Sequence, residues 1–435
     1  MRTSTDRILT THVGSLPRPQ DVVDLLFAQD RGAPVDAAQF EATVARAVND
    51  AVQRQAVAGI DIASDGEMSK ISYATYIRHR LTGFEGDSAR PTPQDLDDFP
   101  EYRDRLVRAG HSATYKRPVC RGPIKVKDLA PVERDIARMK AAMAKAGIEE
   151  GFLNSVSPGT IAVFQPNEYY PSHETYLAAL ADAMREEYEL IVKSGLLVQL
   201  DCPDLAMGRH TRFKGLTDEQ FLRNAELQVE ALNHALANVP ADRVRLHICW
   251  GNYEGSHVHD MDCRKIFPIA VKVKPRALLV EGANPRHEHE WEAWKTIKLP
   301  DDKVLVPGVI GSNTNYVEHP EVVAQRIERY ANVLGRERVM AGSDCEFQGR
   351  ESKLSPVLLR SHVCHIGQTD GEGRDLSSLW MCRPQFHAGP AGFVTVRYDA
   401  QRCERAQVAT LAGVVRGHST ESFPFGKRLI HFPPP

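Results

Sequence analysis

Short apolar runs alternate with longer amphipathic segments along most of the chain. Runs of three to five mostly aliphatic residues, bounded by polar or turn-forming residues, are typical of buried strands. The runs that we predict as strands are Ile8–Thr11, Ile60–Ala63, Phe152–Val156, Leu196–Leu200, Arg245–Ile248, Ala277–Val280, Val304–Val306 and Val339–Ala341. The intervening segments with apolar residues at helical spacing are Ala37–Ala58, Val132–Ala146, His173–Lys193, Thr217–Ala237, His287–Lys295 and Glu318–Leu334.

This alternation of strand and helix predicts a parallel sheet with helices packed against its outer face. Eight strands at this spacing predict a (β/α)₈ TIM-type barrel, which we place at residues 1–349. The longest insertion is Thr82–Arg117, which is rich in Pro, Asp and Arg. Residues 350–435 show little periodicity, and we expect them to form a poorly ordered, irregular C-terminal extension.

Composition narrows the class of protein. The chain has 435 residues, a net charge of −3 and 42 % hydrophobic residues, which is typical of a soluble globular protein. We find no basic stripe of the kind that binds nucleic acid and no apolar run long enough to span a membrane, so we expect a cytoplasmic protein. The eight cysteines form no CxxC pair. In a reducing compartment they are free, catalytic or bound to a metal.

Polar, chemically capable residues follow the C-terminal ends of the predicted strands. These segments are Thr11-His12-Val13-Gly14-Ser15, Asp65-Gly66-Glu67, Asp201-Cys202, His247-Ile248-Cys249, Glu281 and Asp344-Cys345. In a (β/α)₈ barrel these strand ends converge on one mouth, where the chemistry of the fold is found. We therefore expect these side chains to share one site.

Four of these residues suit a zinc ion. His247 and Cys249 are two apart on an extended segment, so both side chains can face the same side. Glu281 and Cys345 would complete a tetrahedral set of imidazole, thiolate and carboxylate ligands. The His-x-Cys pair alone is more often a core histidine beside a buried cysteine. A zinc ion with two thiolate ligands and one carboxylate ligand is electron-rich. Such an ion is better suited to binding a substrate thiol as a thiolate than to generating hydroxide from water.

The remaining residues suit the recognition of an amino acid. Glu67 and Asp201 are predicted to hold a substrate ammonium group, with helix capping as the alternative for Glu67. Val13 and Ser15, in the turn after the first strand, would offer a backbone N–H and a hydroxyl to a carboxylate, or would form a plain βα turn. His287 is expected at the surface or behind the metal ligands.

These motifs resemble the C-terminal catalytic barrel of the cobalamin-independent methionine synthases, in their short, single-barrel branch. The resemblance runs from about Ile8 to Cys345. The segment from Thr10 to Pro19 is similar to the turn that holds the carboxylate of homocysteine, and Glu67 and Asp201 fall on the amine-binding carboxylates. His247, Cys249, Glu281 and Cys345 fall on the zinc ligands of the family. The resemblance implies zinc-dependent transfer of a methyl group to a small thiol, by default homocysteine, to give methionine.

The departures from the family leave alternatives open. The full-length synthases have an additional N-terminal barrel that helps to bind folate, and we find no counterpart of it in these 435 residues, so we expect the methyl donor to differ or to stay open. Where the family has proton-transferring Asp and His residues, this chain has Gly308 to Asn313, and we predict that the nearby His319 substitutes as the catalytic group. The alternatives are an epoxyalkane–coenzyme M transferase-like alkylation, which the retained Glu67 and Asp201 disfavour, and a barrel inactivated by its altered C-terminus. The oligomeric state is open, a homo-oligomer included.

Overall fold

The computed structural model describes residues 1–89, 92–108, 116–252, 255–314 and 317–347, together with two short strands at 385–388 and 394–397. The chain divides into two compact units, Met1–Ser377 and Ser378–Pro435. In the second unit, strands β10 (Gln385–Ala388) and β11 (Val394–Arg397) pair antiparallel. Apart from these two strands, the predicted extension at 350–435 lies outside the described residues, so its irregularity and its boundary stay predictions.

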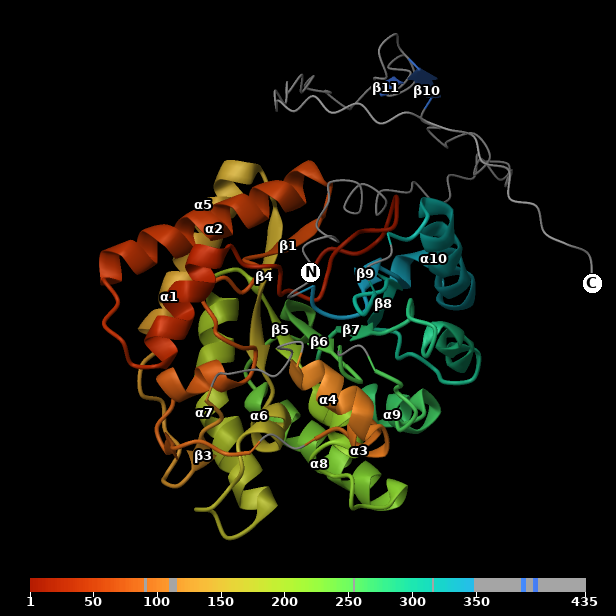
Figure 1. Ribbon diagram of the computed structural model, residues 1–435. Coiled ribbons are helices and arrows are strands. Elements are labelled where there is room, and N and C mark those ends of the chain that lie inside the picture. The colour runs from red at the N-terminus through yellow and green to blue at the C-terminus, as the bar shows by residue number, and fades with distance from the viewer. Residues whose placement is uncertain are drawn as a thin grey trace, which may run out of the picture. The chain divides into compact units, whose positions relative to one another are not determined.

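The first unit contains a parallel sheet with the strand order β1-β4-β5-β6-β7-β8-β9. Its strands are β1 (Ile62–Ser64), β4 (Glu150–Val156), β5 (Leu197–Asp201), β6 (Val244–His247), β7 (Ala277–Val280), β8 (Val304–Ile310) and β9 (Gly342–Ser343). A separate antiparallel pair, β2 (Phe84–Glu85) and β3 (Val119–Cys120), lies within and just after the predicted insertion. Figure 1 shows the parallel strands at the centre of this unit with helices around them. Six of the predicted strands coincide with strands of this sheet.

The first and last predicted strands differ from the expectation. Both make single parallel bridges, Thr10 with Ala341 and Leu305 with Val339, and β9 begins one residue after the predicted run. Their hydrogen bonds nevertheless close the sheet: Thr11 N donates to the carbonyl of Ala341 (2.9 Å), and Ile62 N donates to that of Thr10 (3.2 Å). The predicted (β/α)₈ TIM-type barrel is confirmed, with its first strand reduced to a bridging segment.

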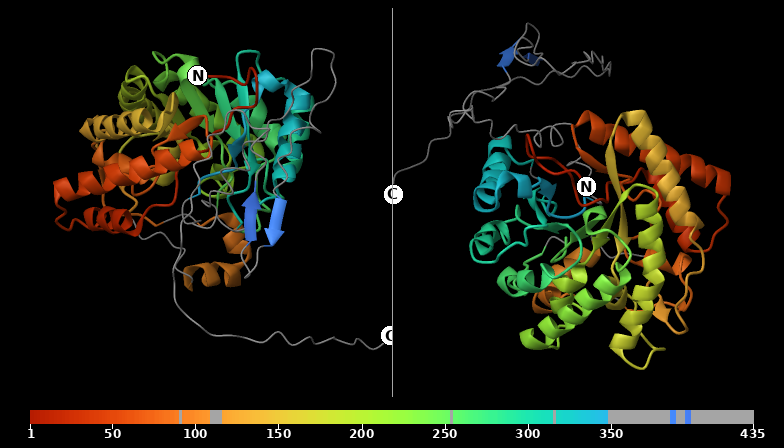
Figure 2. Two further views of the ribbon diagram at one scale, coloured as in Figure 1. Left: turned by 90° about the horizontal axis from the view of Figure 1, so that it is seen from above. Right: turned by 180° about the vertical axis from the view of Figure 1, so that it is seen from behind.

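Helices cover the outside of the barrel (Figure 2). The α-helices are α1 (Gln20–Asp30), α2 (Ala37–Val57), α3 (Gln94–Asp98), α4 (Pro100–Arg108), α5 (Ala130–Ala146), α6 (Pro158–Phe164), α7 (His173–Lys193), α8 (Asp218–Ala235), α9 (Cys263–Ala270) and α10 (Pro320–Leu334). Five of the six predicted helical segments are present, as α2, α5, α7, α8 and α10. The predicted helix His287–Lys295 is instead a 3₁₀-helix, η5 (Glu288–Lys295), and α1, α3, α4, α6 and α9 were missed. Side-chain caps fix the starts of α7 and α8 through Ser172 and Thr217.

The buried apolar side chains form two layers, one on each side of the strands. The inner layer fills the barrel and consists of Leu9, Val13, Ile62, Phe152, Leu197, Ala277, Leu279, Val304, Val306 and Met340. Arg245 also lies inside the barrel, with its guanidinium 3.9 Å from the centroid of the Phe152 ring. The outer layer packs the strands against the helices. A filled interior leaves the strand ends as the place for a site.

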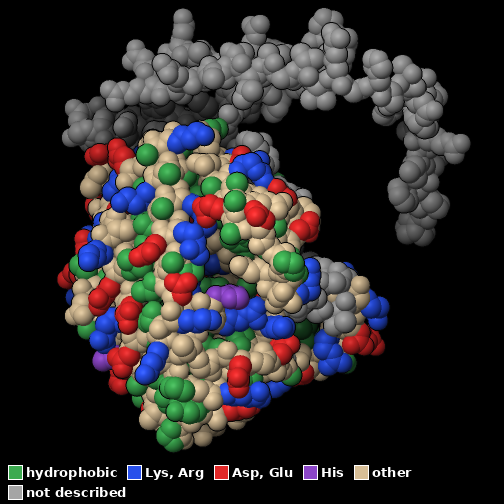
Figure 3. All heavy atoms as spheres, turned by 90° about the vertical axis from the view of Figure 1, so that its left-hand side faces the viewer, with side chains coloured by type: hydrophobic (Ala, Val, Ile, Leu, Met, Phe, Trp, Pro, Cys, Tyr) green, Lys and Arg blue, Asp and Glu red, His purple; other side chains and the backbone are tan. Residues whose placement is uncertain are grey.

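The surface carries charges of both signs. On the face shown in Figure 3, Lys and Arg side chains are interspersed with Asp and Glu. Within the described ranges, no helix combines the length and the apolar character needed to cross a bilayer.

Candidate functional site

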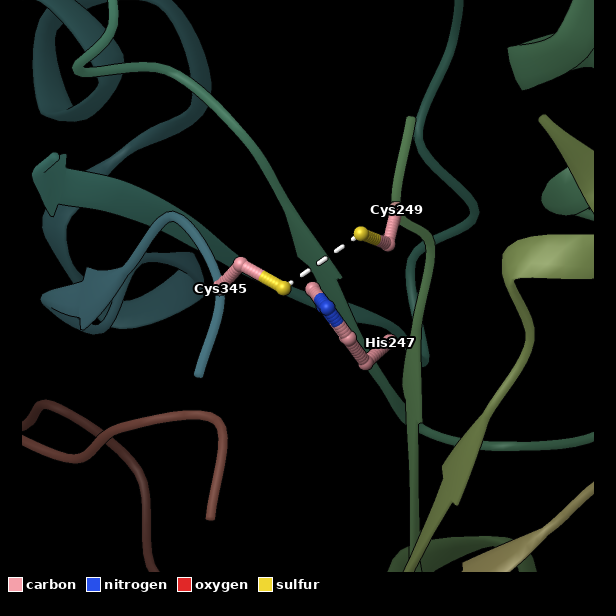
Figure 4. Close-up of side chains that lie close together, drawn as sticks. All are labelled: His247, Cys249 and Cys345. Carbon is pink, nitrogen blue, oxygen red and sulfur yellow. Dashed lines mark hydrogen bonds between the residues drawn. The ribbon is translucent and has the colours of Figure 1, made fainter. Parts of the chain in front are cut away.

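Three of the four predicted metal ligands meet at the mouth of the barrel. His247 ends β6, Cys249 lies two residues further on, and Cys345 follows β9. Their ligand atoms all lie within 4.8 Å of one another, and the two sulfur atoms are 3.3 Å apart. Figure 4 shows the Cys249 and Cys345 sulfurs pointing at each other and the imidazole of His247 turned towards them. We refer to these three residues as the ligand cluster.

The electrostatics of the ligand cluster favour a bound cation. Burial, with Arg245 adding to it, lowers the pKa of His247 to about 3, so its ring is neutral, which is the form that binds metals. Both nitrogens of this ring are buried without a hydrogen-bond partner among the described residues. Contact with Cys249, together with burial, raises the pKa of Cys345 well above its usual value. Two adjacent buried thiols need a nearby positive charge to become thiolates.

The donor set fits zinc. One zinc ion with Zn–S bonds of about 2.3 Å bridges sulfur atoms up to about 4.6 Å apart, and the observed separation of 3.3 Å falls inside that reach. Imidazole and thiolate are the ligands that zinc prefers in proteins. The two unpartnered nitrogens of His247 give an imidazole ligand with no competing hydrogen bond.

Glu281, the fourth predicted ligand, lies beside the cluster. Its carboxylate is not within 4.8 Å of all three ligand atoms of the cluster. It follows β7 and is buried, and its Oε1 accepts a hydrogen bond from the backbone N–H of Trp250 (2.9 Å). Its Oε2 accepts one from the side-chain amide of Asn284 (2.7 Å). Burial raises the pKa of Glu281 to about 7. Its role as a metal ligand stays a prediction.

A second cluster consists of three carboxylates, Glu67, Asp201 and Glu346, whose nearest oxygens lie within 4.8 Å of one another. We refer to it as the acidic triad. The sequence predicted that Glu67 and Asp201 act together, and the structure brings them together. Glu346 was missed. The signal that could have found it is its position directly after Cys345, at the end of the last strand.

Glu67 occupies an unusual backbone conformation. Its φ is +56°, in the left-handed region that costs a residue with a Cβ about 1 kcal/mol, and the preceding Gly66 has φ +69°. The carboxylate of Asp65 supports this turn by accepting a hydrogen bond from Glu67 N (2.9 Å). The side chain of Glu67 is fully buried, and neither carboxylate oxygen has a hydrogen-bond partner in the part of the chain that the structure describes. A buried, unpaired carboxylate held by a strained turn is typical of a binding site.

The other two carboxylates carry shifted pKa values. Burial and the charge of Glu67 raise the pKa of Asp201 to about 8, although its carboxylate accepts a hydrogen bond from Asn154 (3.0 Å). Burial, with repulsion from Glu67 and Asp201, raises the pKa of Glu346 well above its usual range. Two strongly raised values in one cluster indicate a site arranged for a positively charged ligand.

The turn after the first strand offers a hydroxyl but little free backbone at Val13. The N–H of Val13 donates to the Ser343 hydroxyl (3.2 Å), and its carbonyl accepts a hydrogen bond from the side chain of Asn154 (2.9 Å). Gly14, with φ +137°, packs so closely on Asn154 that a Cβ would lie 2.1 Å from the Asn154 Oδ1. The buried hydroxyl of Ser15 has no hydrogen-bond partner among the described residues. Ser15 is therefore the group of this turn that suits a ligand.

The histidines flanking the site fall into two groups. His319 is exposed and caps α10 by accepting a hydrogen bond from Glu321 N through its Nδ1 (3.2 Å), so its predicted catalytic role is not supported by a buried position and stays a prediction. His287, by contrast, is buried behind Glu281, with Nε2 3.9 Å from the Glu281 carboxylate and 3.0 Å from that of Asp260. Asp260 also pairs with His257 (3.0 Å).

A parallel (β/α)₈ barrel with a His–Cys–Cys cluster and an acidic triad at its mouth defines a class of barrels suited to thiol chemistry. The model of one such family, described as the catalytic domain of cobalamin-independent synthase, matches residues 8–364. The chain belongs to this family. The match also corrects the sequence expectation, because the similarity continues past Cys345 to residue 364.

Individual relatives cover nearly the whole of the barrel. A methionine synthase from Saccharolobus solfataricus is 25 % identical over 364 residues, which are 81 % of this chain and 92 % of the relative. One from Pyrococcus furiosus is 24 % identical over 355 residues, or 80 % and 88 % of the two chains. A structure of a vitamin-B12-independent methionine synthase from a Shewanella species has a TM-score of 0.62 at 18 % identity, covering 82 % of this chain and 95 % of that one. The structural likeness supports the barrel fold.

Proposed function

We propose that this protein is a zinc-dependent methyltransferase that methylates the thiol of homocysteine to give methionine. Membership of the cobalamin-independent synthase family and the names of its relatives as methionine synthases support the reaction class. The observation that carries the zinc dependence is the convergence of His247, Cys249 and Cys345 within 4.8 Å. The methyl donor is left unassigned.

In this proposal the ligand cluster holds the metal. A zinc ion held there would lower the pKa of the substrate thiol and keep it as a thiolate at neutral pH. The neutral ring of His247 and the sulfurs of Cys249 and Cys345 supply three ligands. Glu281 is the proposed fourth, held at one oxygen by Trp250 N–H and at the other by the Asn284 amide.

The substrate is oriented by residues beside the cluster. Glu67 and Asp201 accept hydrogen bonds from the ammonium group, because charge-assisted bonds repay the burial of two carboxylates. Ser15 donates its unpartnered hydroxyl to the substrate carboxylate. A sulfonate thiol such as coenzyme M has no amine and would leave Glu67 buried and unpaired, so the acidic triad favours an amino-acid thiol over the epoxide reaction.

The test measures zinc and thiol binding together. Purified protein is expected to hold one zinc per chain, and Cys249→Ser is expected to lose it. Cys120→Ser is the matched control, because Cys120 is a buried thiol outside the cluster whose sulfur lies 3.5 Å from the Gly122 carbonyl, a contact that serine can replace. Homocysteine, and not coenzyme M, is expected to change the absorption of the cobalt-substituted protein. A folded, active protein without metal would contradict the proposal.

A further inference from the structure

The acidic triad contains one carboxylate more than the proposed substrate contacts require. We propose that Glu346 is a third ligand of the substrate ammonium group and that it makes the site selective for thiols carrying a free primary amine. This inference rests on the proposed function, because it concerns the amine of the thiol substrate. It adds a residue and a specificity to that function.

The geometry of the triad matches an ammonium ion. The three carboxylate oxygens lie within 4.8 Å of one another. For three atoms no more than 4.8 Å apart, a point exists that lies no more than about 2.8 Å from each, which is within the length of a charge-assisted N–H···O hydrogen bond. A primary ammonium group has three N–H bonds. Each can therefore reach one member of the triad.

The burial of the triad favours a cationic ligand. Glu67 is fully buried and Asp201 and Glu346 are 2 % and 7 % exposed, so water cannot stabilise their charges well. Neither oxygen of Glu67 has a partner among the described residues. The neighbouring cation Lys70 directs its ammonium group to the backbone carbonyl of Asn154. An unpaired, buried carboxylate facing two others is the arrangement that an incoming cation completes.

The position of Glu346 favours an aminothiol over a second metal ion. Glu346 directly follows Cys345, so the backbone carries a proposed metal ligand and a member of the triad at consecutive residues, about 3.8 Å apart at their Cα atoms. A small molecule whose thiol lies at the ligand cluster therefore has its amine, a few bonds away, within reach of Glu346. The charges of Lys70 and Arg18, which stabilise the Glu346 carboxylate, would repel a divalent cation more than a monovalent one.

Three carboxylates impose selectivity because an uncharged group cannot satisfy them. An N-acylated amine has a single N–H and no positive charge. The desamino analogue of homocysteine has no nitrogen and therefore no N–H group at all. Each would leave carboxylates buried without partners, which costs more than the loss of one hydrogen bond. The triad thus rejects such thiols.

The experiment compares three thiols on the cobalt-substituted full-length protein by optical titration: homocysteine, N-acetylhomocysteine and the desamino analogue. The wild type is expected to bind homocysteine at least about 100-fold more tightly than either analogue. Glu346→Gln is expected to weaken homocysteine binding about 10- to 100-fold while changing binding of the desamino analogue less than about threefold. Glu337→Gln, an exposed glutamate in η6 (Arg336–Arg338), is the matched control and is expected to change neither.

Other results would overturn the inference. Equal weakening of all three thiols by Glu346→Gln, or an unchanged preference for homocysteine, would show that Glu346 does not contact the amine. A wild type that prefers homocysteine over the two analogues by less than about tenfold would also show that Glu346 does not contact the amine. Binding of Mn²⁺ to the zinc-loaded wild type that is lost in Glu346→Gln would assign the triad to a metal ion. Failure of the wild type to bind any of the thiols would instead contradict the proposed function itself.

Discussion

Asn284 donates two hydrogen bonds to Asp344, one from its backbone N–H (2.8 Å) and one from its side-chain amide (3.0 Å). The same amide also donates to Glu281 (2.7 Å), and the backbone N–H groups of Gly282 and Ala283 donate to the second oxygen of Asp344 (2.8 Å each). Asp344 therefore joins the end of β7 to the end of β9. Because Cys345 is the next residue, this carboxylate fixes the position of a proposed metal ligand.

Asp344→Asn is expected to weaken zinc binding about 10- to 100-fold and to lower the free energy of unfolding by about 2–4 kcal/mol, because one carboxylate oxygen facing backbone N–H groups becomes an NH₂ group. Competition with a chelator measures the first quantity and urea denaturation the second. Asp301→Asn is the control, since Asp301 is 84 % exposed. An unchanged zinc affinity would show that Asp344 does not position Cys345.

The buried pair of His287 and Asp260 is expected to matter more than an exposed pair of the same chemistry. Hydrogen bonds to Asp260 and Glu290, partly opposed by burial, raise the pKa of His287 to about 11, so His287 is charged. Asp260→Asn removes one of the two carboxylates that pair with this charge, since Glu290 stays 3.0 Å from His287, and is expected to cost about 1.5–3 kcal/mol of stability. Asp182→Asn removes the partner of exposed His234 (2.8 Å) and is expected to cost at most about 1 kcal/mol. Urea denaturation measures both losses of unfolding free energy. Equal losses in Asp260→Asn and Asp182→Asn would contradict the expectation that the buried pair contributes more.

The barrel was predictable because its strands and helices repeat a simple pattern. Runs such as Ala277–Val280 are apolar and short, and α7 and α8 begin with capping residues, so periodicity and local chemistry agree. The misses have physical reasons. The helix α9 contains Pro268, which disguises its helical pattern. The predicted strand Ile8–Thr11 forms only a bridge at Thr10, and the hydrogen bonds that hold this segment come from distant residues, so no local signal in the sequence reports them.

The site was predictable only in part. Strand ends placed His247, Cys249 and Cys345 together, since a barrel brings these positions to one mouth. The sequence did not show that Glu346 joins Glu67 and Asp201, because the direction of a side chain beyond a strand depends on the local backbone. It also could not choose between a surface and a buried place for His287, whose burial depends on Asp260, 27 residues earlier.

The stability of the ligand-free protein is expected to fall as the pH rises through the neutral range. Burial and Glu67 raise the pKa of Asp201 from 3.8 to about 8, so the folded state favours the protonated form. Between about pH 4 and pH 8 the unfolded chain has released this proton and the folded chain has not, so each unit of pH costs up to about 1.4 kcal/mol. Above about pH 8 the loss is complete.

Asp201→Asn removes this contribution. The variant is therefore expected to show a shallower decline than the wild type and to be more stable at pH 8 in the absence of a thiol, while the difference shrinks towards pH 5. Urea denaturation at both pH values makes the comparison, with exposed Asp302→Asn as the control. A wild type whose stability rises over this range would show that Asp201 is ionised in the ligand-free fold.

Ser15 and Ser64 provide a matched pair for separating binding from folding. Both are buried, but the Ser64 hydroxyl donates to the carbonyl of Gly14 (2.9 Å) and accepts from Gly66 N (3.0 Å), whereas that of Ser15 has no partner among the described residues. Removing an unpaired buried hydroxyl costs little, and Ser15→Ala is expected to change the free energy of unfolding by less than about 0.5 kcal/mol. Ser64→Ala breaks two hydrogen bonds and is expected to cost about 1–2 kcal/mol.

Thiol binding is expected to show the opposite order. Ser15→Ala loses the hydroxyl proposed to hold the substrate carboxylate and is expected to raise the dissociation constant of homocysteine about tenfold, because a hydrogen bond to a charged group contributes roughly 1.5 kcal/mol or more. For homocysteamine-type thiols, which lack the carboxylate, the same variant is expected to bind as the wild type does. If both thiols lose affinity equally, Ser15 acts on the shape of the pocket and does not contact the carboxylate.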